Sequence, residues 1–424
     1  LRTLGHKFPY SVLTDLIVSD PNQGSVCTMI AFIYIFFIFL LSVHYLNFSG
    51  PLSPVFDLLG VPVGTRTFVV EGLMLIVCLA IFATSKCKAI ITKQVCKLGL
   101  AWMPFILYMI ARCDFTAPYA LKKLALMVIA QFLTLLFLCV AYINDPVRFN
   151  KQFFPLTILY ALLLYGYSLV NPSVEVYNLW TNPVERVTIE KTNPIWLARS
   201  FATGSLCFLL LQNSPKWSSY AGLLLFIPGI LLTGSRGPLI SLFLIASLWG
   251  MYRWFKSGKT LIVGTVLICA IIPITIIVFV QYQEALDRYF HRGTQKSMLL
   301  ESGRLQGVMT ALEEFSFAPM LGRGLGKYGT VAGIERKYIT PQKVVAVYPH
   351  NVPVEILAEL GLIGFVLFLI ALRPGEWMFD LSNRYVYFFF LSFLFSLTSG
   401  DMTANSGLFI FSLISKLASE PSEH

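Results

Sequence analysis

Long apolar runs decide what this chain can fold into. The stretch from Leu261 to Val280 is apolar on both faces, whereas a strand of a transmembrane β-barrel alternates apolar and polar side chains. A helix needs ~20 mostly apolar residues to cross a hydrocarbon core of ~30 Å, and within that core its backbone groups must bond to one another. The pattern therefore predicts an all-α polytopic membrane protein.

The composition agrees with a membrane protein that has many spans. Of the 424 residues, 56% are hydrophobic and 13% are charged, which is too apolar for a soluble protein of this length. We predict about twelve transmembrane helices, at residues 27–46, 68–84, 98–112, 121–143, 153–170, 195–212, 219–233, 237–255, 260–281, 352–372, 385–399 and 403–417.

Lysines and arginines in the short connections predict the orientation, because cytoplasmic loops carry an excess of them. With the N-terminus in the cytoplasm, fifteen lie inside and seven outside, so both termini are predicted to be cytoplasmic. The inside residues are Arg2, Lys7, Lys86, Lys88, Lys93, Lys97, Arg148, Lys151, Lys216, Arg253, Lys256, Lys259, Arg373, Arg384 and Lys416. The outside residues are Arg66, Arg112, Lys122, Lys123, Arg186, Lys191 and Arg236, of which Lys122 and Lys123 depart from the rule.

The chain is predicted to be one membrane domain with an outside cap. Residues 1–281 hold the first nine helices, and residues 352–424 hold the last three and a cytoplasmic C-terminus. Between them, residues 282–351 form an outside loop of about seventy residues. Loops of this length usually contain structure of their own and carry function.

Two segments of this large loop are predicted to be ordered. Residues 297–317 indicate one or two amphipathic helices, because apolar side chains recur there at helical intervals. Residues 322–326 contain three glycines, which allow positive φ and close approach to a ligand. A smaller outside loop, 171–194, is predicted to be irregular from its Asn, Pro and Thr content.

Five ionisable side chains are predicted to gather near the outside face, although such groups are costly within membrane spans and often mark function. They are Glu71, Arg199, Arg236, His350 and Asp401. Arg199 is equally compatible with an ion pair to a carboxylate such as Glu71, and Arg236 with an interfacial arginine that reaches lipid headgroups. The net charge of +10 reflects the cytoplasmic bias or an attraction for anionic lipid and phosphate.

Neither a disulfide framework nor a metal site is predicted. The eight cysteines lie in or beside predicted helices, and none falls in the large loop. No spacing of Cys and His is typical of a metal site.

The strongest candidate for chemistry is His350-Asn351, which is followed by nine residues and then by Gly361-Leu-Ile-Gly364. This stretch closes the polar loop and opens an apolar helix, so the imidazole is predicted at the boundary between water and lipid. A histidine has a reference pKa near ~6.5 and can accept a proton at neutral pH. Glu355, roughly 7 Å deeper along the helix, could orient the imidazole, line a cavity or tie helices together.

A second motif, Thr233-Gly-Ser-Arg-Gly237, predicts a tight turn between two apolar runs. The planar fork of Arg236 suits phosphate oxygens. In the large loop, Arg304 and Arg323 are further candidates, because several arginines can neutralise a departing pyrophosphate without a metal.

These residues resemble the O-antigen ligase and polymerase superfamily of bacterial envelope glycosyltransferases. The family hallmark is His-Asn or His-Ser, nine residues and Gly-x-x-Gly after a large periplasmic loop. The Thr-Gly-Ser-Arg-Gly turn and the glycine-rich segment at 322–326 resemble two other family motifs. The resemblance implies a GT-C-like fold in the inner membrane of a Gram-negative bacterium, with a periplasmic active site. No nucleic acid is expected as a partner.

The same resemblance implies a reaction. O-antigen glycan would pass from undecaprenyl diphosphate to a sugar hydroxyl of the lipid A core, without cofactor or metal and with inversion. His350 would be the general base, supported by Asn351 and Glu355. Arg236 and Arg304 would hold the diphosphate, with Arg323 and Arg199 as helpers.

Two alternatives remain open from the sequence. An O-antigen polymerase uses a similar donor, but polymerases more often divide polar content between two large loops, whereas one loop dominates here. A transporter of a lipid-linked glycan is typically built from repeated halves with a site near the bilayer midplane, whereas the polar groups here are predicted at one face. The sequence leaves the sugar repeat, the acceptor sugar and the oligomeric state open.

Overall fold

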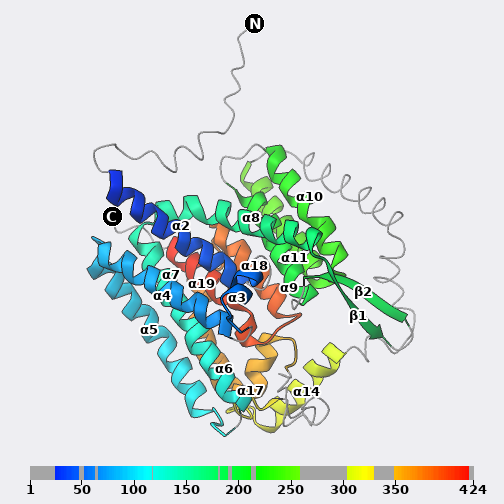
Figure 1. Ribbon diagram of the computed structural model, residues 1–424. Helices are drawn as coiled ribbons and strands as arrows, with labels where there is room; N and C mark the ends of the chain where they lie inside the picture. The colour runs from blue at the N-terminus through cyan, green and yellow to red at the C-terminus, as the bar shows by residue number, and fades with distance from the viewer. Residues whose placement is uncertain are drawn as a thin grey trace.

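The structure is a computed structural model that describes residues 24–46, 52–62, 65–116, 118–179, 182–189, 193–211, 216–257, 303–328 and 348–419. These residues are predominantly helical (Figure 1). The helices before the large loop are α2 (Gly24–Leu46), α3 (Ser53–Leu58), α4 (Arg66–Thr84), α5 (Lys88–Ala111), α6 (Pro118–Ala125), the π-helix η3 (Leu126–Leu133), α7 (Thr134–Asn144), α8 (Pro146–Val170), α9 (Pro194–Leu210), α10 (Lys216–Leu232) and α11 (Arg236–Ser257). They are followed by α14 (Gly303–Phe317), α17 (Val352–Leu372), η5 (Pro374–Glu376), α18 (Arg384–Ser396), η6 (Met402–Ala404) and α19 (Ser406–Ser419).

The helical prediction is confirmed for eleven of the twelve apolar runs, and the remaining run, 260–281, lies outside the described residues. Within the described part, five helices are long and apolar enough to cross a membrane, at Arg66–Thr84, Lys88–Ala111, Tyr119–Asn144, Pro146–Val170 and Val352–Glu376. The helical membrane character is thus confirmed, while the number twelve and the GT-C-like arrangement stay predictions.

One expectation about the smaller outside loop is wrong. Residues 171–194 are not irregular throughout, because β1 (Ser173–Leu179) pairs antiparallel with β2 (Asn182–Thr188), Ser173 lying opposite Thr188. The signal was present in the sequence: valines alternate with other side chains at Val174 and Val176, and β-branched residues favour strands. The prediction rested on amino-acid composition, which does not report the alternation of side chains that indicates a strand.

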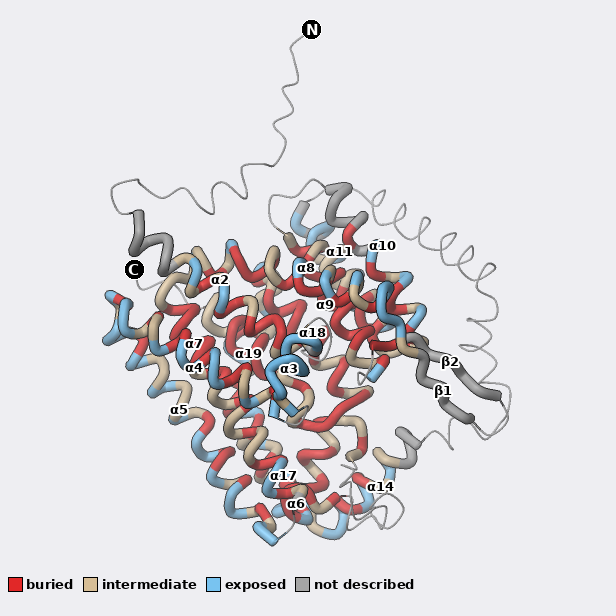
Figure 2. The backbone as a smooth tube through the Cα atoms, in the orientation of Figure 1, coloured by how far each residue is buried: buried red, intermediate tan, exposed pale blue. Residues whose placement is uncertain are grey.

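The centre of the bundle is formed by α18 and α19, which are mostly buried, while α5 runs along the edge with many exposed positions (Figure 2). Aromatic side chains fill the centre, where the rings of Phe388 and Phe411 stack at 5.0 Å. Small residues let helices approach: a Cβ added at Gly204 on α9 would lie 2.7 Å from the Cβ of Ala161 on α8. Close packing through small residues is typical of membrane helices.

Candidate active site

His350 stands directly before α17 and has a left-handed backbone, with φ of 59°. Such a conformation is uncommon for a residue other than glycine and often occurs at functional sites. Its ring packs edge-on against Tyr348, with the centroids 4.6 Å apart. The histidine is partly buried and lies where the polar segment meets the apolar helix, as the sequence predicts.

Asn351 fixes the position at which α17 begins. Its Oδ1 accepts a hydrogen bond from Val354 N at 3.1 Å, which caps the helix, and its Nδ2 donates to Leu397 O at 3.3 Å. An asparagine is a strong N-cap residue because it satisfies an amide that has no partner within the helix. Asn351 therefore supports His350 by anchoring the adjacent helix end to the end of α18.

Gly361 breaks α17 with φ of 67° and ψ of −169°. The break exposes backbone groups on both sides of the kink, and the segment after α14 bonds to them. Arg323 N donates to Ala358 O at 2.9 Å, and Gly324 N donates to Glu359 O at 2.8 Å. Beyond the break, the amides of Leu362 and Ile363 donate to Pro319 O at 2.8 Å and to Met320 O at 3.2 Å.

The glycines of the two motifs make this interlock possible. A Cβ on Gly361 would lie 2.4 Å from Met320 O, and a Cβ on Gly322 would lie 2.3 Å from Glu359 O. Gly322, Gly324 and Gly326 all have positive φ, as predicted. The surfaces that Gly322 and Gly326 approach most closely are the backbones of α17 and α6. The expected approach of this segment to a ligand stays a prediction.

Lys123 joins this interlocked unit from α6 and is completely buried. Its Nζ contacts Glu355 Oε1 and lies 2.7 Å from Glu359 Oε2. Gly326 N donates to Glu359 Oε2 at 2.9 Å, and Met402 N donates to Glu355 Oε2 at 3.0 Å. Of the three roles considered for Glu355, the structure shows the tie between helices.

The cluster agrees with the prediction that Lys123 lies outside despite its positive charge. It is not a solvated loop charge, because its ammonium is compensated by two buried carboxylates. Lys123 was not among the candidate site residues predicted from the sequence. Its predicted position outside, where basic residues are less common, was a signal that could have identified it. Lys123 lies in the last turn of α6, three residues before the start of the π-helix η3, a feature that often occurs at functional sites.

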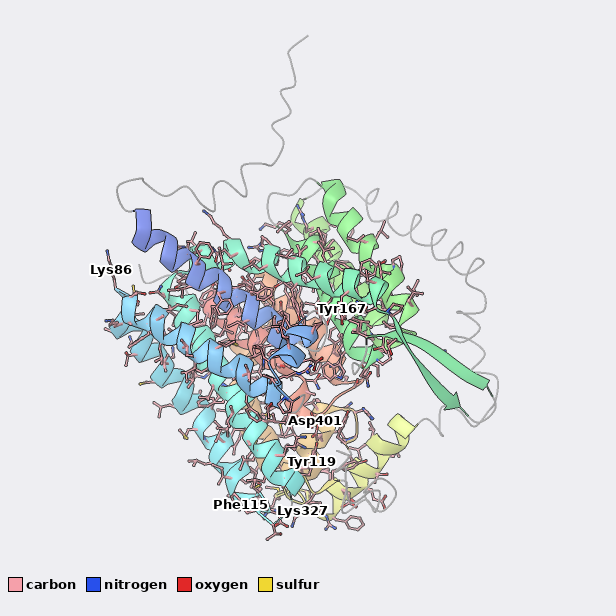
Figure 3. All side chains as sticks on the ribbon, in the orientation of Figure 1. Lys86, Phe115, Tyr119, Tyr167, Lys327 and Asp401 are labelled. Atoms are coloured by element: carbon pink, nitrogen blue, oxygen red, sulfur yellow. The ribbon has the colours of Figure 1, made fainter. Side chains whose placement is uncertain are left out.

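Asp401 organises the crossing between α18 and α19. Its Oδ1 accepts from Ala404 N at 2.9 Å, which caps η6, and its Oδ2 accepts from the hydroxyl of Tyr119 at 2.8 Å. Figure 3 shows Tyr119 and Asp401 near each other, between the central helices and α17. Met402, which bonds Glu355, is the next residue, so Asp401 belongs to the same polar network as Lys123.

Arg199 supports the same crossing from α9. Its guanidinium donates to Ser399 O at 2.8 Å and to Asn405 Oδ1 at 3.1 Å, and it lies 4.4 Å from the ring centre of Trp196. The cavity beside it measures about 30 Å³, which is space for roughly one water molecule. In this structure Arg199 holds a backbone crossing.

An ion pair between Arg199 and Glu71, one of the two alternatives left open by the sequence, is not formed. Glu71 lies instead 3.0 Å from His44 Nδ1 and accepts a hydrogen bond of 2.9 Å from Thr134 Oγ1. Glu71 is therefore part of a second buried cluster, formed by α2, α4 and α7, apart from the other four predicted residues.

Arg236 is the first residue of α11 and follows the tight turn that its motif predicts. Gly234 has φ of 65°, and Ser235 N donates to Thr233 Oγ1 at 3.2 Å. A Cβ on Gly237 would lie 3.2 Å from Thr398 Oγ1. Asn351 bonds Leu397 O, and Thr398 is the next residue. The Arg236 turn and the histidine motif therefore meet at the same end of α18.

Arg304 lies in the first turn of α14, and its backbone is described. One turn further on, Gly307 packs against the chain before the histidine, because a Cβ there would lie 3.4 Å from Pro349 Cα. The hydroxyl of Tyr328 donates to Gly307 O at 2.8 Å and holds the helix in this place. The predicted helix at 297–317 is confirmed for residues 303–317, and this helix brings the Arg304 turn toward His350.

Arg323 is the candidate arginine with a described ion pair. Its Nε lies 2.9 Å from Glu314 Oε2 on α14, and its guanidinium lies 5.7 Å from the ring centre of Phe317. Among the described residues, no group of three His, Cys, Asp or Glu side chains is arranged to hold a metal ion. The absence of a metal from the reaction stays a prediction.

Comparison with known proteins agrees with the resemblance inferred from the motifs. A family model described as O-antigen ligase matches residues 221–369. The matched stretch contains the turn at 233–237, the glycine-rich segment at 322–326 and the complete histidine motif. Lys123, Arg199 and Asp401 lie outside it. No curated protein and no solved structure shows a match to this chain.

Proposed function

We propose that this protein is an O-antigen ligase, starting from the match of residues 221–369 to a family model described as O-antigen ligase. It transfers O-antigen glycan from undecaprenyl diphosphate to a sugar hydroxyl of the lipid A core. The reaction takes place at the periplasmic face of a Gram-negative inner membrane, with both termini of the protein in the cytoplasm.

The observation that carries this proposal is the meeting of the Arg236 turn, the histidine motif and α14 near His350. Asn351 bonds Leu397 O, and Gly237 packs against the adjacent Thr398. Gly307 on α14 packs against Pro349, the residue before His350. One imidazole is thus flanked by the two segments that bear Arg236 and Arg304, which is the combination that transfer from a diphosphate requires.

His350 is the general base in this proposal. It takes the proton of the acceptor hydroxyl while the hydroxyl oxygen attacks the anomeric carbon of the donor. The bond from that carbon to the diphosphate oxygen breaks, and its electron pair leaves with undecaprenyl diphosphate. A single displacement of this kind inverts the anomeric centre, and general-base catalysis contributes ~10²–10⁴-fold to the rate.

The arginines stabilise the charge that develops on the leaving diphosphate, which is often the larger catalytic contribution. Arg236 and Arg304 are the direct ligands in this proposal. Arg323 is a helper whose guanidinium is shared with Glu314, and Arg199 helps by holding Ser399 and Asn405. Both substrates are lipid-anchored, so the membrane aligns them and lowers the entropic barrier.

The polymerase is the nearest alternative because the family match covers chemistry that both enzymes share. Reconstitution with lipid-linked O-antigen and lipid A core separates the two. A ligase joins glycan to lipid A core, whereas a polymerase lengthens the donor glycan and leaves the core unmodified. Movement of the donor across the bilayer without a new glycosidic bond would instead indicate a transporter.

The two ends of α11 provide a matched arginine comparison for the same assay. Arg236→Ala is expected to abolish transfer, because a diphosphate ligand is lost. Arg253→Ala, at the other end of α11 where the guanidinium lies 5.0 Å from the ring centre of Trp249, is expected to retain it. Equal rates for the two variants would contradict the role of Arg236.

A further inference from the structure

The end of α14 and the turn that follows it expose large apolar side chains. Phe317 is 64% exposed, Met320 54% and Leu321 49%. The described part of the protein therefore leaves these three large apolar side chains about half exposed or more. A contiguous exposed apolar patch marks a surface that contacts another apolar phase.

The position of this turn along α5 shows its depth. The hydroxyl of Tyr108 donates to Leu321 O at 3.2 Å and to Leu360 O at 3.1 Å. Tyr108 lies three residues before the last residue of α5, Ala111, and α5 is long and apolar enough to cross a membrane. The turn therefore sits at the level of the last helical turn of a membrane span, not above it.

The outer surfaces of the neighbouring helices are apolar at this level. On α5, Leu107 is 56% exposed and Ile110 is 38% exposed. On α17, Leu362 is 43% exposed, and its amide donates to Pro319 O at 2.8 Å. We propose that residues 317–321, here called the apolar turn, dip into the lipid bilayer, where acyl chains cover Phe317, Met320 and Leu321 together with these helix faces.

Polar groups at the edge of the apolar turn agree with an interface between acyl chains and headgroups. Arg112 donates to Gly322 O at 2.8 Å, and Lys327 lies 3.1 Å from Asp114 Oδ2. Phe115 and Lys327 lie together at this end of the molecule (Figure 3). Basic residues beside apolar ones are typical of protein surfaces at the headgroup level of a membrane.

The apolar turn is rigidly attached to α17. The kink at Gly361 frees two backbone amides of α17, which donate hydrogen bonds to the carbonyl oxygens of Pro319 and Met320. Lipid contact at this turn therefore anchors the C-terminal end of α14. Where the proposed function holds, the anchor keeps the helix that bears Arg304 beside the bilayer in which the donor lipid is embedded. The lipid contact itself does not depend on that function.

The test uses nitroxide labels on single added cysteines in the full chain reconstituted in phospholipid vesicles. Phe317→Cys and Met320→Cys are compared with Leu107→Cys on the lipid-exposed face of α5. Ser382→Cys is the aqueous control, because Ser382 is exposed in the connection between η5 and α18, outside the candidate membrane spans. Labelled protein without an added cysteine gives the background from the natural cysteines.

The labels at positions 317 and 320 are expected to relax more with oxygen, which concentrates in lipid, than with a water-soluble nickel chelate, as at position 107. A nickel response like that at position 382 would overturn the proposal. Low accessibility to both reagents would also overturn it, because protein would then cover the apolar turn. The readout requires no glycan transfer, so its failure is distinguishable from failure of the proposed function.

Discussion

Two buried clusters of charged side chains lie within the helix bundle, and they differ in what they hold. The cluster of Lys123, Glu355 and Glu359 accepts hydrogen bonds from the backbone amides of Gly326 and Met402. It thereby ties α6, α17, the glycine-rich segment and η6 into one unit. Three of these elements adjoin His350 or pack against its helix.

The cluster of His44, Glu71 and Thr134 is similarly buried but has a narrower reach. The carboxylate of Glu71 contacts the side chains of His44 and Thr134 on two neighbouring helices. Burial of ionisable side chains alone therefore does not distinguish the two clusters. They differ because Glu355 and Glu359 also accept hydrogen bonds from the backbone of η6 and of the glycine-rich segment.

The largest expected effect comes from Lys123→Met, which leaves two carboxylates buried without their cation. Breaking a buried ion pair in this way costs about 3–5 kcal/mol of unfolding free energy, and glycan transfer should fall with it. Denaturant unfolding in detergent measures the stability. The control is Lys122→Met, at the adjacent exposed lysine, which should change the unfolding free energy by less than about 0.5 kcal/mol. Equal losses of unfolding free energy in the two variants would contradict the role of the cluster.

The second cluster sharpens the same comparison. Glu71→Gln keeps an oxygen for the hydrogen bond from Thr134, so glycan transfer should stay near the wild-type rate. Glu355→Gln removes a charge that Lys123 needs, and transfer should fall. A slower rate for Glu71→Gln than for Glu355→Gln would contradict the assignment of the Lys123 cluster, rather than the Glu71 cluster, to the site.

Gly361→Ala is expected to be the next most severe change. The alanine would require a left-handed backbone, and its Cβ would lie 2.4 Å from Met320 O. Backbone strain of this kind costs about 1–3 kcal/mol and would separate the apolar turn from α17. The control is Gly99→Ala on α5, whose added Cβ meets nothing within 4 Å and should not destabilise the protein. Thermal unfolding should therefore show a lower Tm for Gly361→Ala than for Gly99→Ala.

Much of the helical architecture could be predicted from the sequence, because hydropathy identifies the segments that are long and apolar enough to cross a membrane. The kink in α17 could not be predicted, since Gly361 is followed by apolar residues that continue the helix. It is stabilised by hydrogen bonds from the amides after Gly361 to the carbonyl oxygens of Pro319 and Met320, which are distant in sequence. The partners of Lys123 were equally hidden, because Glu355 is 232 residues away in sequence. His350 and the Arg236 turn were identifiable because their spacing is local.

Asn351→Ala should have a moderate effect on stability and a larger one on activity. Loss of an N-cap costs about 0.5–2 kcal/mol, and the link to Leu397 O is lost as well. Asn193 caps α9 by accepting from Ile195 N at 2.9 Å, so Asn193→Ala is the matched control. Asn193→Ala should lose the contribution of the cap, and Asn351→Ala should lose at least as much. A loss of glycan transfer beyond that explained by the lost stability is expected for Asn351→Ala alone.

The smallest effect is expected at an exposed ion pair. Hydrogen bonds from Thr116 and the nearby Lys327 lower the pKa of Asp114 from 3.8 to about 2. A lowered pKa in the folded state stabilises the protein above pH ~4, and this contribution is lost as the pH falls toward 2. Asp114→Asn should therefore show a slightly smaller fall in Tm than wild type between these pH values, and an identical fall would contradict the assignment.

The most direct test of His350 as the base is single-turnover transfer of glycan from undecaprenyl diphosphate to lipid A core in vesicles. With both substrates bound, His350→Ala should slow the chemical step by ~10²–10⁴-fold while leaving donor binding near the wild-type level. An undiminished rate for the His350→Ala enzyme would contradict the proposed mechanism.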